Sequence, residues 1–191
     1  MKKINENGAS MVEVLGVLAI VCMMSIGAFS GIATIQSKIK LQKAQSEISD
    51  LVKGMREQFS AFQPSSSSGE ISPSKLQKAG IFKADNAGNS FGTTTQIFHN
   101  KETEEDDPTF EIHYNDIPSK VCIDLLMADW GSDPSSGLQA IKVSSGSKGF
   151  YWKKNKPDCK TEAHCLPPSL ETAAEECSTK DTVNLIWHYY Y

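Results

Sequence analysis

The first third of the chain is predicted to be one long helix whose character changes midway. From Val14 to Ser37 the sequence contains no charged residue and no proline, so this half would be apolar on every side. The second half carries one apolar stripe, because hydrophobic residues recur at steps of three and four, as on the buried face of an amphipathic helix. The stripe consists of Leu41, Ala44, Ile48, Leu51, Met55, Phe59 and Phe62. With no proline before Pro64, the pattern predicts a helix of about 50 residues, from near Ala9 to Gln63.

Beyond this helix the pattern changes to short elements. The stretch Pro64–Gly69 is rich in serine and is predicted to be a flexible linker. Short helices are predicted where serine or proline precedes a run with helical periodicity, and strands where apolar and polar residues alternate. The predicted helices are residues 72–80, 117–130 and 169–177, and the predicted strands are 96–99, 109–114, 138–144 and 182–191, with 149–153 either a strand or a turn.

The last predicted strand has the clearest alternation of the set. Val183, Leu185, Trp187, Tyr189 and Tyr191 fall on one face, which favours a central position in a sheet. The acidic run at residues 102–107 lies between two predicted strands and is interpreted as a solvated hairpin loop in preference to a calcium site. A long helix followed by a mostly antiparallel sheet with short helices indicates an α+β fold.

Charge and composition argue against two classes of function. The 191 residues carry a net charge of -4. Arg56 is the single arginine among 18 lysines, and because no basic stripe stands out, direct nucleic-acid binding is not predicted. The histidines are scattered, and the sequence contains no catalytic motif or phosphate loop. We therefore predict neither an enzymatic activity nor a cofactor.

The cysteines divide by location. Cys22 lies in the apolar run, where it is expected to pack as a small hydrophobe, and the polar remainder contains Cys122, Cys159, Cys165 and Cys177. Downstream of a membrane-directed segment, these four are interpreted as two disulfides formed in an oxidising compartment, and three pairings are possible. A zinc site made of Cys159, His164, Cys165 and Cys177 is less favoured because its spacing fits no common zinc pattern. No metal site is therefore predicted.

The N-terminal apolar segment first suggests two ordinary interpretations. A cleaved secretory signal would explain Lys2 and Lys3, but the apolar run exceeds the usual length of about 7–15 residues. A transmembrane anchor fits better, since Val14–Ile35 as a helix spans about 33 Å, enough to cross the hydrocarbon core. Neither interpretation explains Glu13, because a carboxylate inside an apolar helix costs about 2.5–3.5 kcal/mol at the bilayer centre and requires a partner.

A third interpretation accounts for Glu13. The segment Gly8-Ala9-Ser10-Met11-Val12-Glu13 follows a basic leader and precedes the apolar helix, and it resembles the processing site of type IV prepilins. The resemblance implies cleavage after Gly8 by a membrane-embedded prepilin peptidase and methylation of the new terminus at Ala9. It also implies that Glu13 sets the assembly register, since the amine of an incoming subunit can pair with Glu13 of its neighbour, as buried polar pairs sometimes do.

The resemblance implies a domain organisation and a set of partners as well. Residues 1–8 would be the leader, 9–37 the transmembrane and filament-core half of the spine helix, and 38–191 the soluble globular domain. The subunit would cross the inner membrane once, with its N-terminus cytoplasmic and its body periplasmic, and would then self-assemble into an extracellular pilus. Membrane lipid, the prepilin peptidase, an assembly ATPase, an inner-membrane platform protein and an outer-membrane secretin are the expected partners. Gly27 and Gly31 fit either close helix packing or ordinary helical glycines.

The body of the chain is similar to the type IVb branch of pilins. Residues 117–126, Trp130-Gly131 and residues 138–143 resemble the cysteine-bearing helix of that branch and the strand after it. The resemblance implies the pilin ladle, a spine helix packed on a sheet, and it favours the pairing Cys122–Cys177, which leaves Cys159–Cys165. We therefore prefer a type IVb-like pilus subunit, with a role in adhesion, conjugation or aggregation. The alternatives are a pseudopilin of a type II secretion system, a minor tip pilin and an unassembled membrane-anchored periplasmic binding domain.

Overall fold

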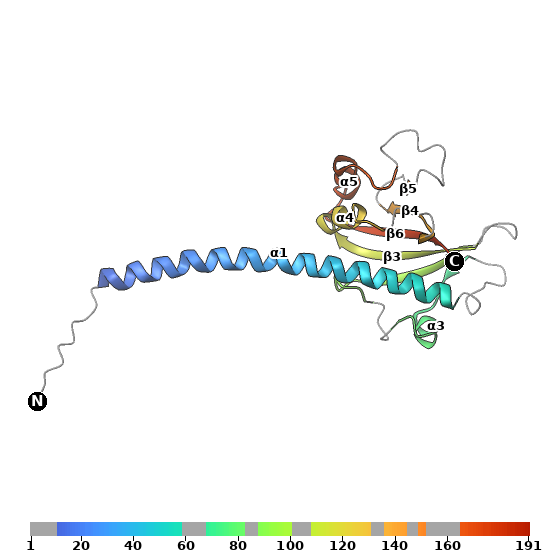
Figure 1. Ribbon diagram of the computed structural model, residues 1–191, viewed down its shortest axis with the longest axis horizontal. Coiled ribbons are helices and arrows are strands. Elements are labelled where there is room, and N and C mark those ends of the chain that lie inside the picture. The colour runs from blue at the N-terminus through green and yellow to red at the C-terminus, as the bar shows by residue number, and fades with distance from the viewer. Residues whose placement is uncertain are drawn as a thin grey trace, which may run out of the picture. The chain divides into compact units, whose positions relative to one another are not determined.

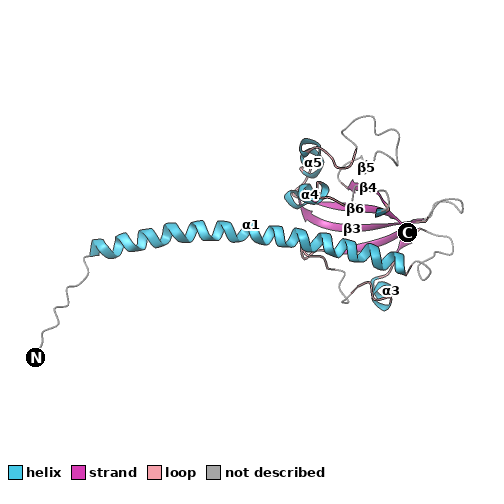
Figure 2. Ribbon diagram, in the orientation of Figure 1, coloured by secondary structure: helices cyan, strands magenta, loops and turns pink. Residues whose placement is uncertain are grey.

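The computed structural model describes residues 11–58, 68–82, 88–100, 108–130, 136–144, 149–151 and 165–191, and between residues 11 and 37 it describes the side chains of Val14, Leu15, Leu18 and Gln36 only. The chain divides into two compact units, residues 1–39 and 40–191. The helices are α1 (Met11–Glu57), α3 (Pro73–Lys78), α4 (Ser119–Leu126) and α5 (Leu170–Cys177), and the strands are β1 (Gly69–Glu70), β2 (Thr95–Asn100), β3 (Thr109–Pro118), β4 (Leu138–Val143), β5 (Gly149–Tyr151) and β6 (Thr182–Tyr190) (Figures 1 and 2).

Helix α1 is the long helix that the periodicity predicts. It spans 47 residues without interruption. In its second half the predicted stripe faces the core, and its buried members are Ala44, Ile48, Leu51 and Met55, joined by Val52. Phe59 and Phe62, which would extend the stripe, lie outside the described residues. The amphipathic half of α1 is therefore held by burial of one face.

The strands form one antiparallel sheet in the order β1-β2-β3-β6-β4-β5. Strand β6 lies between β3 and β4, which confirms the central position predicted from its alternation. Strands β2 and β3 pair as the two arms of the predicted hairpin, while the acidic run at residues 102–107 lies outside the described residues. Together with the helices, this sheet confirms the α+β fold class.

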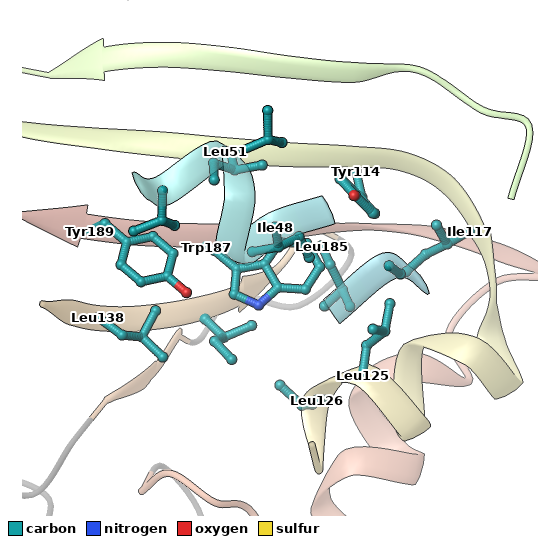
Figure 3. Close-up of a cluster of buried hydrophobic side chains, with 14 of the residues drawn as sticks. Ile48, Leu51, Tyr114, Ile117, Leu125, Leu126, Leu138, Leu185, Trp187 and Tyr189 are labelled. Atoms are coloured by element: carbon teal, nitrogen blue, oxygen red, sulfur yellow. The ribbon is translucent and has the colours of Figure 1, made fainter. Parts of the chain in front are cut away.

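The core lies between α1 and the inner face of the sheet. Trp187 of β6 is completely buried at its centre, and Figure 3 shows it beside Ile48 of α1 and Leu185 of β6. The rings of Tyr114 and Trp130 each meet the Trp187 ring edge to face, with centroids 5.3 Å apart. Such aromatic pairs add about 0.5–1.5 kcal/mol beyond the area that they bury. Trp187 and Tyr189 thus serve as strand core, and the half-buried Tyr191, just after β6, packs against it.

Two expectations are corrected by the structure. Gly69, placed in the flexible linker by composition, instead forms β1 with Glu70 and pairs with His99 and Phe98 of β2. This two-residue edge strand is held by backbone hydrogen bonds, which leave no side-chain pattern in the sequence.

The predicted helix at residues 117–130 is also shorter in the structure. Strand β3 continues through a register shift after Tyr114 to Ile117 and Pro118, which pair with Val183 and Thr182. Proline fixes an extended backbone before it and lacks the N–H that a helix interior needs, so helix α4 starts only at Ser119.

The outer face of the sheet carries a cross-strand cluster of charged residues. The Glu111 carboxylate of β3 accepts a 2.8 Å hydrogen bond from His113 Nε2 and lies 3.8 Å from Lys142 Nζ of β4. His188 of β6 is directly opposite Glu111 in the strand register. The hydrogen bond from His113, followed by the nearby charges of His188 and Lys142, lowers the pKa of Glu111 against the opposing effect of burial.

We expect Glu111→Gln to reduce the loss of stability in acid. Because the folded pKa of Glu111 is lowered, its carboxylate contributes stability above the ordinary value of 4.5, and this contribution disappears as the pH falls through the folded pKa. Thermal unfolding of the purified protein between about pH 6 and about pH 3 measures the effect. Exposed Glu171→Gln is the control, and an equal acid-induced fall in melting temperature for wild type and Glu111→Gln would contradict the pairing.

Candidate functional site

The expected processing and assembly residues fall at the N-terminal end of the chain. Gly8 and Ala9 lie outside the described residues, whereas Glu13 lies in the first turn of α1 and its side chain is not described. Gly27 and Gly31 are helical in α1. Near Glu13, Val14, Leu15 and Leu18 are 48%, 58% and 54% exposed. Neighbouring apolar side chains that one chain leaves uncovered mark a surface for protein or lipid contact.

The expected membrane span, Val14–Ile35, falls within helix α1. Among the residues for which the structure describes the side chains, no helix is long and apolar enough to cross a membrane. Most of the expected span Val14–Ile35 lies outside that set.

A disulfide joins the two short helices of the body. Cys122 of α4 and Cys177 of α5 are bonded, as the resemblance implies, with their Cα atoms 5.8 Å apart and both side chains fully buried. Cys165 is also disulfide-bonded, but Cys159 lies outside the described residues, so the pairing Cys159–Cys165 stays a prediction. The Cys122–Cys177 bridge covalently links helix α4 to helix α5 within the body.

Glu47 links helix α1 by hydrogen bonds to the segment before β2 and to β3. Its carboxylate accepts a 3.0 Å hydrogen bond from the Ser90 backbone N–H and a 3.3 Å hydrogen bond from the Tyr114 hydroxyl. Lys43 adds an ion pair at 3.8 Å. Burial and the nearby Glu47 carboxylate raise the pKa of the Tyr114 hydroxyl far above its usual range, so this tyrosine stays a hydrogen-bond donor at all ordinary pH values.

Arg56 forms a second attachment near the end of α1. Its Nη2 donates to the backbone carbonyls of Ser136, at 2.6 Å, and Tyr190, at 3.3 Å, and its Nε also donates to Tyr190 at 3.3 Å. Gly137 allows this approach, because a Cβ there would collide with Arg56 Nη2. We call these contacts the Arg56 clasp. It ties the end of the last strand to helix α1, and a forked guanidinium suits two carbonyls better than lysine would.

Sequence reasoning missed both attachments to α1. A lone arginine in a chain otherwise rich in lysine was the available signal for the Arg56 clasp. Its carbonyl partners are 80 and 134 residues away along the chain, and no periodicity connects them. Glu47 looked like one half of an ordinary helix-surface pair with Lys43, which it also forms.

The described residues show structural partners for their histidines. His113 contacts Glu111, His188 Nε2 lies 3.0 Å from Thr109 Oγ1, and His99 Nδ1 lies 3.0 Å from the Tyr191 hydroxyl. Within the described stretches no group of three His, Cys, Asp or Glu side chains is arranged to hold a metal ion. An open groove of about 630 Å³ runs beside α1 past Arg56, Trp130 and Tyr189.

Comparison with known proteins defines the fold. No protein-family model and no curated protein matches the sequence. The structure is similar to that of a type IVb pilin from Salmonella typhi, with a TM-score of 0.51 and 16% identity over 78% of this chain and 99% of that one. It is also similar to TcpA, a type IV pilin from Vibrio cholerae El Tor biotype, with a TM-score of 0.50 and 16% identity over 78% of this chain and 98% of that one. The chain therefore has a type IV pilin fold, most like that of the type IVb branch.

Replacing Cys122 and Cys177 together by alanine should lower the free energy of unfolding. The bridge closes a loop of 55 residues, which contributes about 4 kcal/mol on a chain-entropy account. Denaturant unfolding of the purified full chain measures the loss, with Cys22→Ala as the control for removing a cysteine from the apolar run. Unchanged stability in the double variant would show that the bridge is idle. Adding reductant to that variant then reports on the bridge of Cys165 alone.

Gly137→Ala should destabilise the protein more than Gly80→Ala. Both glycines have positive φ, +68° and +74°, and share a backbone cost of roughly 1–2 kcal/mol for a residue with a Cβ. Only at Gly137 does the new Cβ meet Arg56, since nothing lies within 4 Å of a Cβ at Gly80. Melting temperatures measure the difference. In an Arg56→Ala background the two substitutions should cost about the same, and a persistent excess at Gly137 would refute the steric role of Arg56.

Proposed function

We propose that this protein is a structural subunit of a type IVb-like pilus filament. One observation carries the proposal. A glycine, Gly8, stands five residues before a lone acid, Glu13, at the head of an apolar helix that continues into a body with a type IVb pilin fold. The processing pattern lies in residues 8–13, and the fold is that of the body. Each is expected of the same class of protein.

Cleavage after Gly8 gives Glu13 a partner. In the proposed mature chain the new amine belongs to Ala9, four residues before Glu13, which is the spacing of about one helical turn. In a stack of subunits the amine of an incoming copy meets Glu13 of a copy already in place. An unpaired carboxylate in apolar surroundings is costly, so only the register that pairs the two charges is stable. Methylation at Ala9 keeps the positive charge of the terminus.

Lipid and neighbouring copies cover the apolar helix in turn. Before assembly, Val14–Ile35 lies in the inner membrane, with Lys2 and Lys3 on the cytoplasmic side and the body in the periplasm. On assembly the same surface packs against the helices of other copies in the filament core, with Gly27 and Gly31 allowing close approach. The exposure of Val14, Leu15 and Leu18 in the single chain supports a need for such cover.

In this proposal the body forms the outer surface of the filament. The chain is a substrate of a prepilin peptidase and performs no catalysis itself. An assembly ATPase and a platform protein assemble it, and the filament leaves the cell through a secretin. The disulfide-linked pair α4–α5 supports a pilin over a pseudopilin of a secretion system, since major pseudopilins tend to lack this cysteine framework. The surface formed by the sheet and these helices then determines adhesion, aggregation or conjugation.

The proposal predicts that Glu13→Ala separates processing from assembly. Mass spectrometry of the native wild-type protein should show a chain that begins at N-methyl-Ala9. The variant should be cut at the same bond, yet sheared surface filaments should contain at least about tenfold less of it, since an unpaired amine in the filament core costs more than 1.4 kcal/mol.

Glu6→Ala, which removes an acid from the leader, is the matched control and should assemble normally. A mature protein that retains Met1–Gly8 would support the unassembled membrane-anchored domain instead. Normal filaments from Glu13→Ala would refute the register role of the acid.

A further inference from the structure

Two helices far apart in the sequence carry opposite charge on exposed surfaces. The segment Lys38–Lys43 of α1 contains three lysines, and no acid occurs between Glu13 and Glu47. Helix α5 contains three glutamates and no lysine or arginine. We call these the basic segment of α1 and the acidic face of α5. Lys40 and Lys43 are exposed on the first, and Glu171 and Glu175 on the second.

Each surface also presents a large apolar side chain to solvent. Ile39 in the basic segment is 57% exposed, and Leu170 at the start of α5 is 62% exposed. Helix geometry places Ile39 beside Lys43, four residues on, and places Glu171 beside Glu175 in the same way. Ile39 is thus an exposed apolar residue with charge beside it, and contacts between proteins combine an apolar centre with a polar rim.

Three of these exposed charges, Lys43, Glu171 and Glu175, make little use of ion pairing in the described part of the chain. Lys43 makes a 3.8 Å ion pair with Glu47, in which the lysine side chain is 67% exposed. Among the described residues, neither Glu171 nor Glu175 forms an ion pair. Glu171 gains from its place in the first turn of α5, but Glu175 lies toward the negative end of the helix dipole, where an acid is disfavoured. The local structure therefore does not account for Glu175.

We infer that the basic segment of α1 in one copy docks on the acidic face of α5 in another copy. Charge complementarity identifies a second copy of this chain as the occupant, with Ile39 adding apolar area to the contact. In the proposed filament the contact is made head to tail and is not reciprocated within a pair. It is then heterologous, and where its rotation does not close a ring, its repetition extends an open filament. The inference rests on the proposed pilus function and names the residues that join its bodies.

Charge reversal in cells that assemble the full chain tests this contact. Lys40→Glu/Lys43→Glu and Glu171→Lys/Glu175→Lys should each lower the yield of sheared filaments about tenfold, as expected when two weak attractions become repulsions. The variant that combines all four substitutions restores the attraction with reversed sign. Its yield should return to within about threefold of wild type.

Lys75→Glu/Lys78→Glu on α3 is the matched control, with the same change in net charge at exposed lysines of another helix. It should assemble normally. All variants should retain the wild-type melting temperature within about 2 °C, because their substitutions are on the surface.

Two results would overturn the contact. The first is a four-substitution variant whose filament yield stays low. The second is a normal filament yield from either pair of charge reversals. If Lys40→Glu/Lys43→Glu also loses binding to vesicles that contain anionic lipid, and the glutamate reversals do not rescue filaments, the basic segment binds lipid headgroups instead. Absence of filaments from wild-type cells with a processed N-terminus would overturn the pilus function itself, and this contact with it.

Discussion

The body of this protein depends on burial of one stripe of helix α1 against the sheet. Ala44, Ile48 and Met55 are completely buried there, in one cluster with Trp187 of the central strand. Burying each large apolar side chain contributes about 1.5–3 kcal/mol. Because the stripe fixes how α1 is rotated about its axis, it also determines which polar residues of the helix point toward the body and which point away.

The polar residues of α1 accordingly divide into two groups. Glu47 and Arg56 lie at the margins of the stripe, where they bind backbone groups and a tyrosine hydroxyl of the body. Lys40, Lys43 and Lys53 are exposed, and the ion pairs of the last two, with Glu47 and Glu57, are at 3.8 and 3.9 Å. Exposed pairs of this kind contribute about 0–1 kcal/mol. The first group therefore stabilises the body, and the second remains available for contacts outside it.

Regular burial is the part of this structure that the sequence predicts well. Helix α1, residues 110–114 of β3 and strand β6 bury one face each, so periods of 3.6 and 2 appear directly in the order of the residues. Strand β1 is held by backbone pairing alone, and the Arg56 clasp joins residues whose approach is determined by the finished fold. Neither leaves a local pattern. The expected processing residues show the opposite case. The spacing of Gly8 and Glu13 in the sequence predicts a processing site, whereas the side chains of both residues lie outside the described set.

The proposed filament follows from what a single copy leaves unsatisfied. One chain leaves Val14, Leu15 and Leu18 exposed, and it carries exposed lysines on α1 and exposed glutamates on α5. A symmetric dimer could place the basic segment of each copy against the acidic face of the other, and would then be closed to further copies. A head-to-tail contact of unlike surfaces leaves one of each open at the two ends of a stack, unless the rotation between copies closes a ring. The proposed filament therefore requires a contact whose rotation does not close, so that each added copy presents the same open surface to the next.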